Sequence, residues 1–236
     1  MFVKICGTTN LADAELAIEL GADALGFIFA PSRRRVTAES AAEIMKHLPA
    51  HVVAVGVFTD PDVDEIARTV REAGLAAVQM HWPYDAQVIE ALRREFADAL
   101  VLWQVLGFAV DPADEEAAER EFVFRLRAAM HDPRLDVVLL DAVKGTASGG
   151  LGQVLPWGRV GSILRTAKIS AEQAGRERGV TVPKIVLAGG LRAENVRDAV
   201  AMVQPWGVDV VSGVETEPGR KDPVRMRAFL EAARRA

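Results

Sequence analysis

The sequence is short of several residue types, and each shortage excludes a class of protein. Cysteine occurs once, as Cys6, so no disulfide can form within the chain and no cysteine-rich metal site is possible. The four histidines, His47, His51, His81 and His131, do not form a clear His/Asp ligand cluster. We therefore expect no metal site.

Positive charge is also in short supply. With 28 Lys and Arg against 33 Asp and Glu, the formal net charge is −5, which favours neither nucleic acid nor an anionic membrane as a partner. No apolar run approaches the roughly 20 residues of a membrane-spanning helix. Residues Met1–Lys4 enter a strand pattern directly, so we expect no signal peptide. We expect a cytoplasmic protein with no membrane partner, either a monomer or a homodimer.

Short apolar runs alternate with longer helical patterns along the whole chain. The runs are continuously apolar, which is typical of strands covered on both faces. The expected strands are Phe2–Cys6, Asp23–Phe29, Val52–Phe58, Ala76–Met80, Ala99–Val105, Val137–Leu140, Lys184–Ala188 and Val208–Val211. The expected helices are Asn10–Leu20, Thr37–Leu48, Pro61–Ala73, Asp85–Phe96, Asp114–Met130, a stretch within Arg159–Arg178, Ala193–Val203 and Asp222–Arg235. Asn10 and Thr37 are expected N-caps, and Pro61 is expected in a first helical turn.

Eight strand–helix units predict one (β/α)8 barrel domain of the α/β class, a TIM barrel over residues 1–236. A doubly wound open sheet is the alternative, and it usually carries a G-x-G-x-x-G fingerprint after its first strand. Here the first strand ends in Cys6-Gly7-Thr8-Thr9-Asn10, which does not match that fingerprint. The barrel is therefore the favoured fold.

The last two expected strands both end in small residues, at Gly189-Gly190 and at Ser212-Gly213. Glycine allows positive φ and a close approach of the backbone. Backbone N–H groups that converge in this way bind phosphate. Because the loops after strands seven and eight form the usual phosphate site of a (β/α)8 barrel, we expect an anion there.

Chemistry in such a barrel is found at the carboxyl ends of the strands, so polar residues there are candidates. The candidates are Cys6, the triplet Arg33-Arg34-Arg35, His81, Asp141 and Asp209. Lys4 lies two residues before Cys6 and projects to the same face, so its cation is expected to lower the pKa of the thiol.

Each candidate also has an inert interpretation. A lone cysteine is more often a small core residue, and the arginines usually form a solvated patch. His81 could simply satisfy a hydrogen bond, and Asp141 could cap the next loop. However, a carboxylate that ends the apolar run Val137–Leu140 needs partners or a chemical role.

Several segments together resemble the phosphoribosylanthranilate isomerase family. They are spread along the chain in the order found in that family. The segments are Lys4–Asn10, Leu140–Asp141, Gly149–Gly152, Leu187–Val196, Val208–Glu215 and Pro218–Asp222.

The resemblance implies a (β/α)8 barrel that catalyses an Amadori rearrangement in tryptophan biosynthesis. It implies that Asp141 is the general acid, that Cys6 is the general base, and that Arg35 receives the carboxylate of a phosphorylated sugar–anthranilate substrate. No metal or organic cofactor is implied, because the nitrogen of the substrate acts as the electron sink. The substrate-binding residues implied with Arg35 are His81, Gly149, Gly150, Gly189, Gly190, Asp209, Ser212 and Gly213.

The sequence departs from the family pattern at two places. His81-Trp82-Pro83 stands where the family commonly has His-Gly, and Leu155-Pro156-Trp157 stands where it usually has Phe-Asp-Trp. One alternative is another sugar-phosphate isomerase or epimerase on the same scaffold. The other is a non-catalytic barrel that binds sugar phosphates, which would need neither Cys6 nor Asp141.

Overall fold

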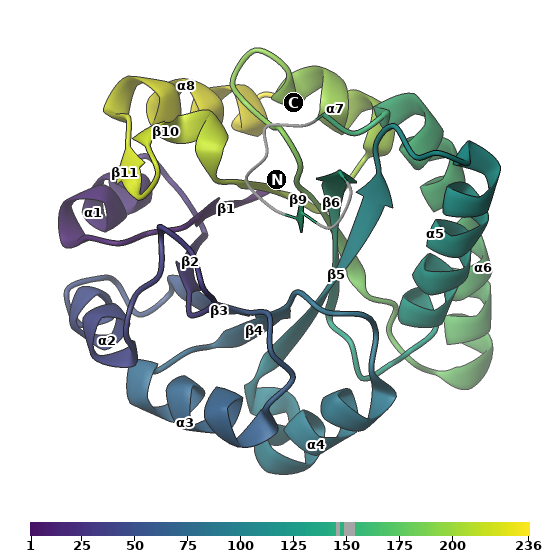
Figure 1. Cartoon of the computed structure of the whole chain (residues 1–236), viewed down its shortest axis with the longest axis horizontal. Helices are drawn as coiled ribbons and strands as arrows, with labels where there is room; N and C mark the ends of the chain where they lie inside the picture. The colour runs from purple at the N-terminus through teal and green to yellow at the C-terminus, as the bar shows by residue number, and fades with distance from the viewer. Residues whose placement is uncertain (145–146, 149–153) are drawn as a thin grey trace.

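The computed structural model describes residues 1–144, 147–148 and 154–236. Within these residues, eight parallel strands form a closed ring, and helices surround it (Figure 1). The ring closes because β1 pairs with both β2 and β9, and β5 pairs with β6. The strands are β1 (Phe2–Cys6), β2 (Ala24–Ile28), β3 (Val53–Phe58), β4 (Ala77–Met80), β5 (Val101–Ala109), β6 (Val137–Lys144), β8 (Lys184–Leu187) and β9 (Gly207–Val210). The predicted barrel is confirmed.

The helices follow the strands as predicted, and side-chain caps define where most of them begin. Asn10 and Thr37 accept hydrogen bonds from Asp13 and Ser40, as expected of N-caps. The prediction for Pro61 is wrong, because Asp62 is the N-cap of the third helix and Pro61 lies before it. The helices are α1 (Leu11–Glu19), α2 (Ala38–Lys46), α3 (Val63–Ala73), α4 (Ala86–Phe96), α5 (Glu115–Met130), α6 (Trp157–Arg178), α7 (Val196–Val203) and α8 (Pro223–Arg234).

Strands β5 and β6 extend further than predicted. They pair from Trp103↔Val137 to Ala109↔Val143, so Asp141 lies within β6 and not at its end. A polar side chain does not end a strand whose backbone is still paired with a neighbour. The remaining short elements are β7 (Ala147–Ser148), β10 (Glu215–Glu217), β11 (Arg220–Lys221) and the 3-10 helices η1 (Ala97–Ala99) and η2 (Ser212–Val214).

Apolar side chains fill two regions. The larger region lies between the strands and the helices, and the smaller one fills the inside of the barrel around Trp103. Lys4 is fully buried near the Trp103 ring, with its Nζ 5.7 Å from the ring centroid. Among the described residues, no helix has the length and apolarity that crossing a membrane requires.

Candidate active site

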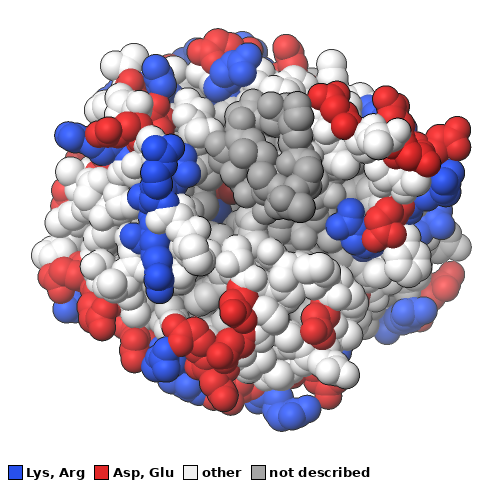
Figure 2. Space-filling model, viewed as in Figure 1, with Lys and Arg blue, Asp and Glu red and all other residues white. Residues whose placement is uncertain are grey.

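A cavity opens at the carboxyl end of the barrel, where Figure 2 shows a central hollow with Lys and Arg side chains on its β2 side. The predicted residues that line it are Cys6, His81, Asp141, Gly189, Gly190, Asp209, Ser212 and Gly213. Arg35 is exposed and does not line the cavity, whereas Arg34 does. Gly149 and Gly150 lie outside the described residues.

Cys6 lies on β1 opposite Gly26 of β2. A Cβ atom at Gly26 would lie 2.5 Å from the Cys6 sulfur, so only glycine leaves room for the thiol there. Burial raises the pKa of the Cys6 thiol, while the Lys4 ammonium acts in the opposite direction. Lys4 acts to lower the pKa of the thiol, as expected, but burial outweighs the cation, so the expectation of a thiol pKa below its ordinary value is wrong.

Lys4 and Asp209 form a buried ion pair across neighbouring strands. Lys4 Nζ lies 2.9 Å from Asp209 Oδ1, and the two residues are partners in the register of β1 and β9. Burial acts to lower the pKa of Lys4, but attraction by Asp209 raises it above its ordinary value. Lys4 therefore stays charged beneath the cavity, and the Asp209 carboxylate is paired with it.

Asp141 is the carboxyl group of the cavity that is best suited to donate a proton. Burial raises its pKa to about 7, although the Ala142 N–H, 2.8 Å from Oδ1, acts to lower it. Gly189 passes close by at φ +82°, and a Cβ there would lie 2.8 Å from the Ala142 nitrogen. A substantial fraction of Asp141 is therefore protonated near neutral pH.

His81 lies at the end of β4 and is held by Gln79. The side-chain nitrogens Nε2 of Gln79 and His81 lie 2.6 Å apart, and both residues line the cavity. Burial, with repulsion from Lys4, lowers the pKa of His81 to about 4, so the imidazole is neutral near pH 7. Sequence reasoning missed Gln79, although a polar residue two positions before His81 in an apolar run was the available signal.

The predicted phosphate cradle lies at one side of the cavity. Gly190 has φ +63°, and a Cβ at Gly213 would lie only 1.9 Å from the Leu191 carbonyl oxygen. Both positions therefore require glycine, because a side chain would be strained or would clash. The backbones after β8 and β9 can thus approach a small anion closely.

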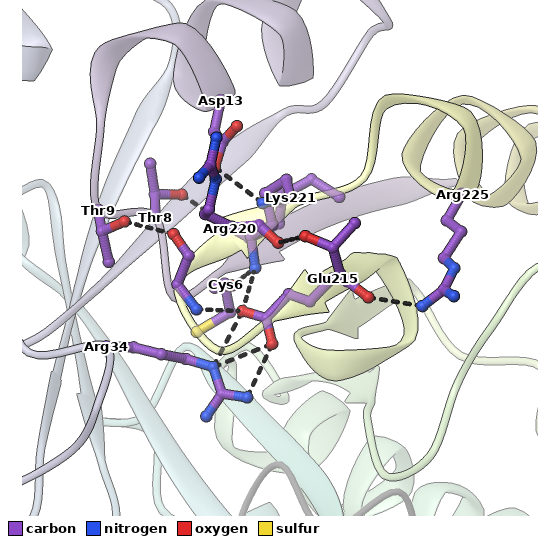
Figure 3. A network of polar contacts seen from close by, with 12 residues as sticks. Cys6, Thr8, Thr9, Asp13, Arg34, Glu215, Arg220, Lys221 and Arg225 are labelled. Atoms are coloured by element: carbon purple, nitrogen blue, oxygen red, sulfur yellow. Dashed lines mark hydrogen bonds and ion pairs between the residues drawn. The ribbon is translucent and has the colours of Figure 1, made fainter.

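Two buried charged residues near Cys6 were also missed from the sequence. Glu215 accepts hydrogen bonds from Arg34, with Nη2 2.7 Å from Oε2, and from Lys221 Nζ at 3.1 Å (Figure 3). Lys221 Nζ also donates to the Cys6 carbonyl at 2.5 Å. Their signal was a carboxylate and a lysine flanking the Pro218-Gly219 turn.

Within the described residues, no group of three or more His, Cys, Asp or Glu side chains could hold a metal ion. A closed barrel with a buried thiol, a carboxyl of raised pKa and a glycine-lined cradle at its mouth defines a (β/α)8 barrel enzyme.

Comparison with known proteins gives the family. The family model for N-(5'-phosphoribosyl)anthranilate isomerase matches residues 3–232. An N-(5'-phosphoribosyl)anthranilate isomerase of Pelobacter propionicus is 38% identical over 233 residues, 98% of this chain and 95% of the relative. The chain belongs to the N-(5'-phosphoribosyl)anthranilate isomerase family.

Solved structures agree with this assignment. Phosphoribosyl anthranilate isomerase of Thermotoga maritima is 32% identical, with a TM-score of 0.77 and complete coverage of both chains. A phosphoribosyl anthranilate isomerase in complex with reduced 1-(o-carboxyphenylamino)-1-deoxyribulose 5-phosphate is also 32% identical, with a TM-score of 0.72 and the same coverage. Both structures carry the name of the family to which this chain belongs.

Proposed function

We propose that this protein converts N-(5'-phosphoribosyl)anthranilate to 1-(2-carboxyphenylamino)-1-deoxyribulose 5-phosphate in tryptophan biosynthesis. The observation that carries the proposal is that Cys6 on β1 and Asp141 on β6 line one cavity beside the glycine cradle. Membership of the isomerase family supports the choice of reaction. A non-catalytic sugar-phosphate barrel would have no use for an acid and a thiol in this arrangement.

Asp141 acts as the general acid in the first step. Its proton passes to the ring oxygen of the ribose while the bond from C1 to that oxygen breaks. The lone pair of the anthranilate nitrogen forms the C=N bond, which leaves a protonated Schiff base. A buried carboxyl with a pKa of about 7 suits this role, because the acid must be protonated and still release its proton readily.

Cys6 acts as the general base in the second step. The cationic imine makes the C2 proton acidic, and the Cys6 thiolate removes it. The electrons of the C2–H bond move toward the nitrogen, which gives the enolamine, and tautomerisation of that species gives the amino ketone. The nitrogen of the substrate is the electron sink, so the chemistry does not require a metal or organic cofactor.

The remaining residues hold the substrate. The backbone at Gly190 and at Ser212-Gly213 receives the phosphate, and Arg35 receives the anthranilate carboxylate through its planar guanidinium. His81, Gly189 and Asp209 line the same cavity as Cys6 and Asp141 and complete the substrate-binding surface.

The purified protein and N-(5'-phosphoribosyl)anthranilate test this proposal directly. We expect anthranilate-type fluorescence to disappear as the substrate is rearranged, and Cys6→Ala and Asp141→Asn to slow that loss by about 10²- to 10⁴-fold. Folded wild-type protein that leaves the fluorescence unchanged would contradict the isomerase activity. Near-normal turnover in either variant would remove that residue from the mechanism.

A further inference from the structure

Glu215 is the centre of a buried cluster of three charges that join distant parts of the chain. It is 5% exposed, and its carboxylate accepts from Arg34 Nε at 2.9 Å, from Lys221 Nζ at 3.1 Å and from the Gly219 N–H at 3.2 Å. Burial acts to raise the pKa of Glu215, but the hydrogen bonds and charges of Arg34 and Lys221 lower it below its ordinary value. Glu215 is therefore ionised. Burial lowers the pKa of Lys221 below its ordinary value, while the charge of Glu215 acts to raise it.

The cluster is attached directly to the backbone of the candidate base. Lys221 Nζ donates to the Cys6 carbonyl at 2.5 Å, while the same ammonium is held by Glu215 (Figure 3). A Cβ atom at Gly7 would lie 2.8 Å from Cδ of Arg34, so Arg34 packs against the next residue of the turn. Two members of the cluster thus contact Cys6, the last residue of β1, and Gly7, which follows it.

Hydrogen bonds connect this cluster to the surrounding chain. Thr9 Oγ1 donates to the Gly219 carbonyl at 2.6 Å, and the Lys221 N–H donates to Asp13 Oδ2 at 2.9 Å. Arg225 Nη1 donates to the Glu215 carbonyl at 2.6 Å. The β10–β11 segment is therefore fastened to the start of α1 and to α8, so the ammonium of Lys221 has a defined place beside Cys6.

Several charged groups face the Cys6 sulfur. Lys4 on its own strand and Lys221 on β11 favour the thiolate, whereas Asp209 on β9 opposes it. Gly26, its partner on β2, carries no charge, while His81 and Asp141 line the same cavity. Of the two lysines, Lys4 is paired with Asp209, but Lys221 shares Glu215 with a second cation.

We propose that the Arg34–Glu215–Lys221 cluster is a positioning device for the Cys6 thiol, and that Lys221 is the member on which it depends. The proposal rests on the proposed function in that it assigns Cys6 the role of base. Lys221 holds the Cys6 carbonyl and places positive charge near the sulfur, while Glu215 holds Lys221 and Arg34 in place. None of the three needs to touch the atoms of the substrate that react.

Lys221→Met tests the proposal, because methionine retains much of the length of lysine without its charge. The rate at which iodoacetamide alkylates the single thiol, measured by mass spectrometry, reports how much thiolate is present, and the measurement needs no substrate. We expect alkylation at pH 8 to slow by roughly tenfold and its pH profile to move to higher pH, because a nearby cation is lost. The turnover number should fall by roughly 10- to 100-fold with KM little changed, because a displaced base loses its alignment.

The matched control is Lys46→Met, which removes an exposed lysine on α2. It should leave both readouts unchanged. If Lys221→Met does not fold, Glu215→Gln decides by the same two readouts, since it weakens the anchor of Lys221 but keeps the side-chain shape.

A folded Lys221→Met protein with the wild-type alkylation profile and turnover would overturn the proposal. Because alkylation needs no substrate, that outcome would leave the proposed isomerase activity standing. Conversely, wild-type protein without isomerase activity would sink the proposed function, while a shifted alkylation profile in Lys221→Met would still support the cluster.

Discussion

Cys6 and Asp141 show what burial does to two acidic side chains in one cavity. Burial raises the pKa of both groups, so each holds its proton to a higher pH than it would in water. The proposed mechanism needs the proton on Asp141 and the thiol of Cys6 ionised. In that form the two side chains together hold one proton. They also hold one proton when Cys6 is protonated and Asp141 is ionised.

This protonation state predicts a bell-shaped pH dependence of kcat/KM. Activity should fall by roughly tenfold per pH unit below about 7, because both groups are then protonated, and fall again above the thiol pKa, where both are ionised. The residual activity of Asp141→Asn should no longer show the fall in kcat/KM below about pH 7. A wild-type profile that is flat between pH 5 and 7 would contradict the assignment of Asp141.

The two neighbouring arginines differ in what they are free to bind. Arg34 is engaged by Glu215 through Nε and Nη2, whereas Arg35 is exposed and has no ion pair within the described residues. Arg35 can therefore meet the carboxylate of a ligand without breaking an internal contact.

We expect Arg35→Ala to weaken binding of a product analogue by about 1.5–3 kcal/mol, the range for a hydrogen bond to a charged group. Binding of ribose 5-phosphate, which lacks the anthranilate carboxylate, should change little. Calorimetry on both ligands checks this, with Arg33→Ala as the matched control. Equal losses for the two ligands would exclude Arg35 as the carboxylate site and turn attention to Arg34.

At the scale of elements, the loops that follow β8 and β9, where we expect the anion, come very close to each other. The Leu191 carbonyl oxygen lies only 1.9 Å from where a Cβ of residue 213 would be. The two strands pair at Val186↔Gly207 and Leu187↔Val208, which fixes the spacing of the loops that follow.

Gly213→Val should therefore abolish inhibition by inorganic phosphate. The clash with Leu191 forces the loop after β9 outward, so its N–H groups no longer converge. In the wild type, phosphate should be a weak competitive inhibitor. Gly158→Ala is a matched control, because a Cβ there meets nothing within 4 Å. Undiminished phosphate inhibition in folded Gly213→Val would place the anion elsewhere.

At the scale of the whole molecule, the raised pKa of Asp141 links the active site to stability. Well below pH 4 this carboxyl is protonated in both the folded and the unfolded chain. As the pH rises toward about 7, the unfolded chain releases the proton while the folded chain keeps it. The free energy of unfolding therefore decreases over this pH range.

Asp141→Asn should remove this loss. We expect the variant to be more stable than the wild type at pH 8 by on the order of 1–4 kcal/mol, since each pKa unit corresponds to about 1.4 kcal/mol. At pH 4 the difference should nearly vanish. Urea unfolding at both values measures it, and a wild type as stable as the variant at pH 8 would contradict the raised pKa.

The sequence by itself determined the order of strands and helices, and hence the barrel. Continuous apolar runs can be covered on both faces in few ways, and the N-caps Asn10 and Thr37 act locally on the chain. The close approach of the backbone at Gly189, Gly190 and Gly213 was also predictable, because glycine leaves room for it and allows positive φ.

Only the tertiary structure decided the electrostatics of the site. The pKa of Cys6 depends on the balance between burial and Lys4, and no local pattern reports that balance. Lys221 lies 215 residues from Cys6 in the chain, and Glu215 lies 181 from Arg34, so closure of the barrel brings these charges together. Charge acts through space at a few ångströms, whereas the sequence records only separation along the chain.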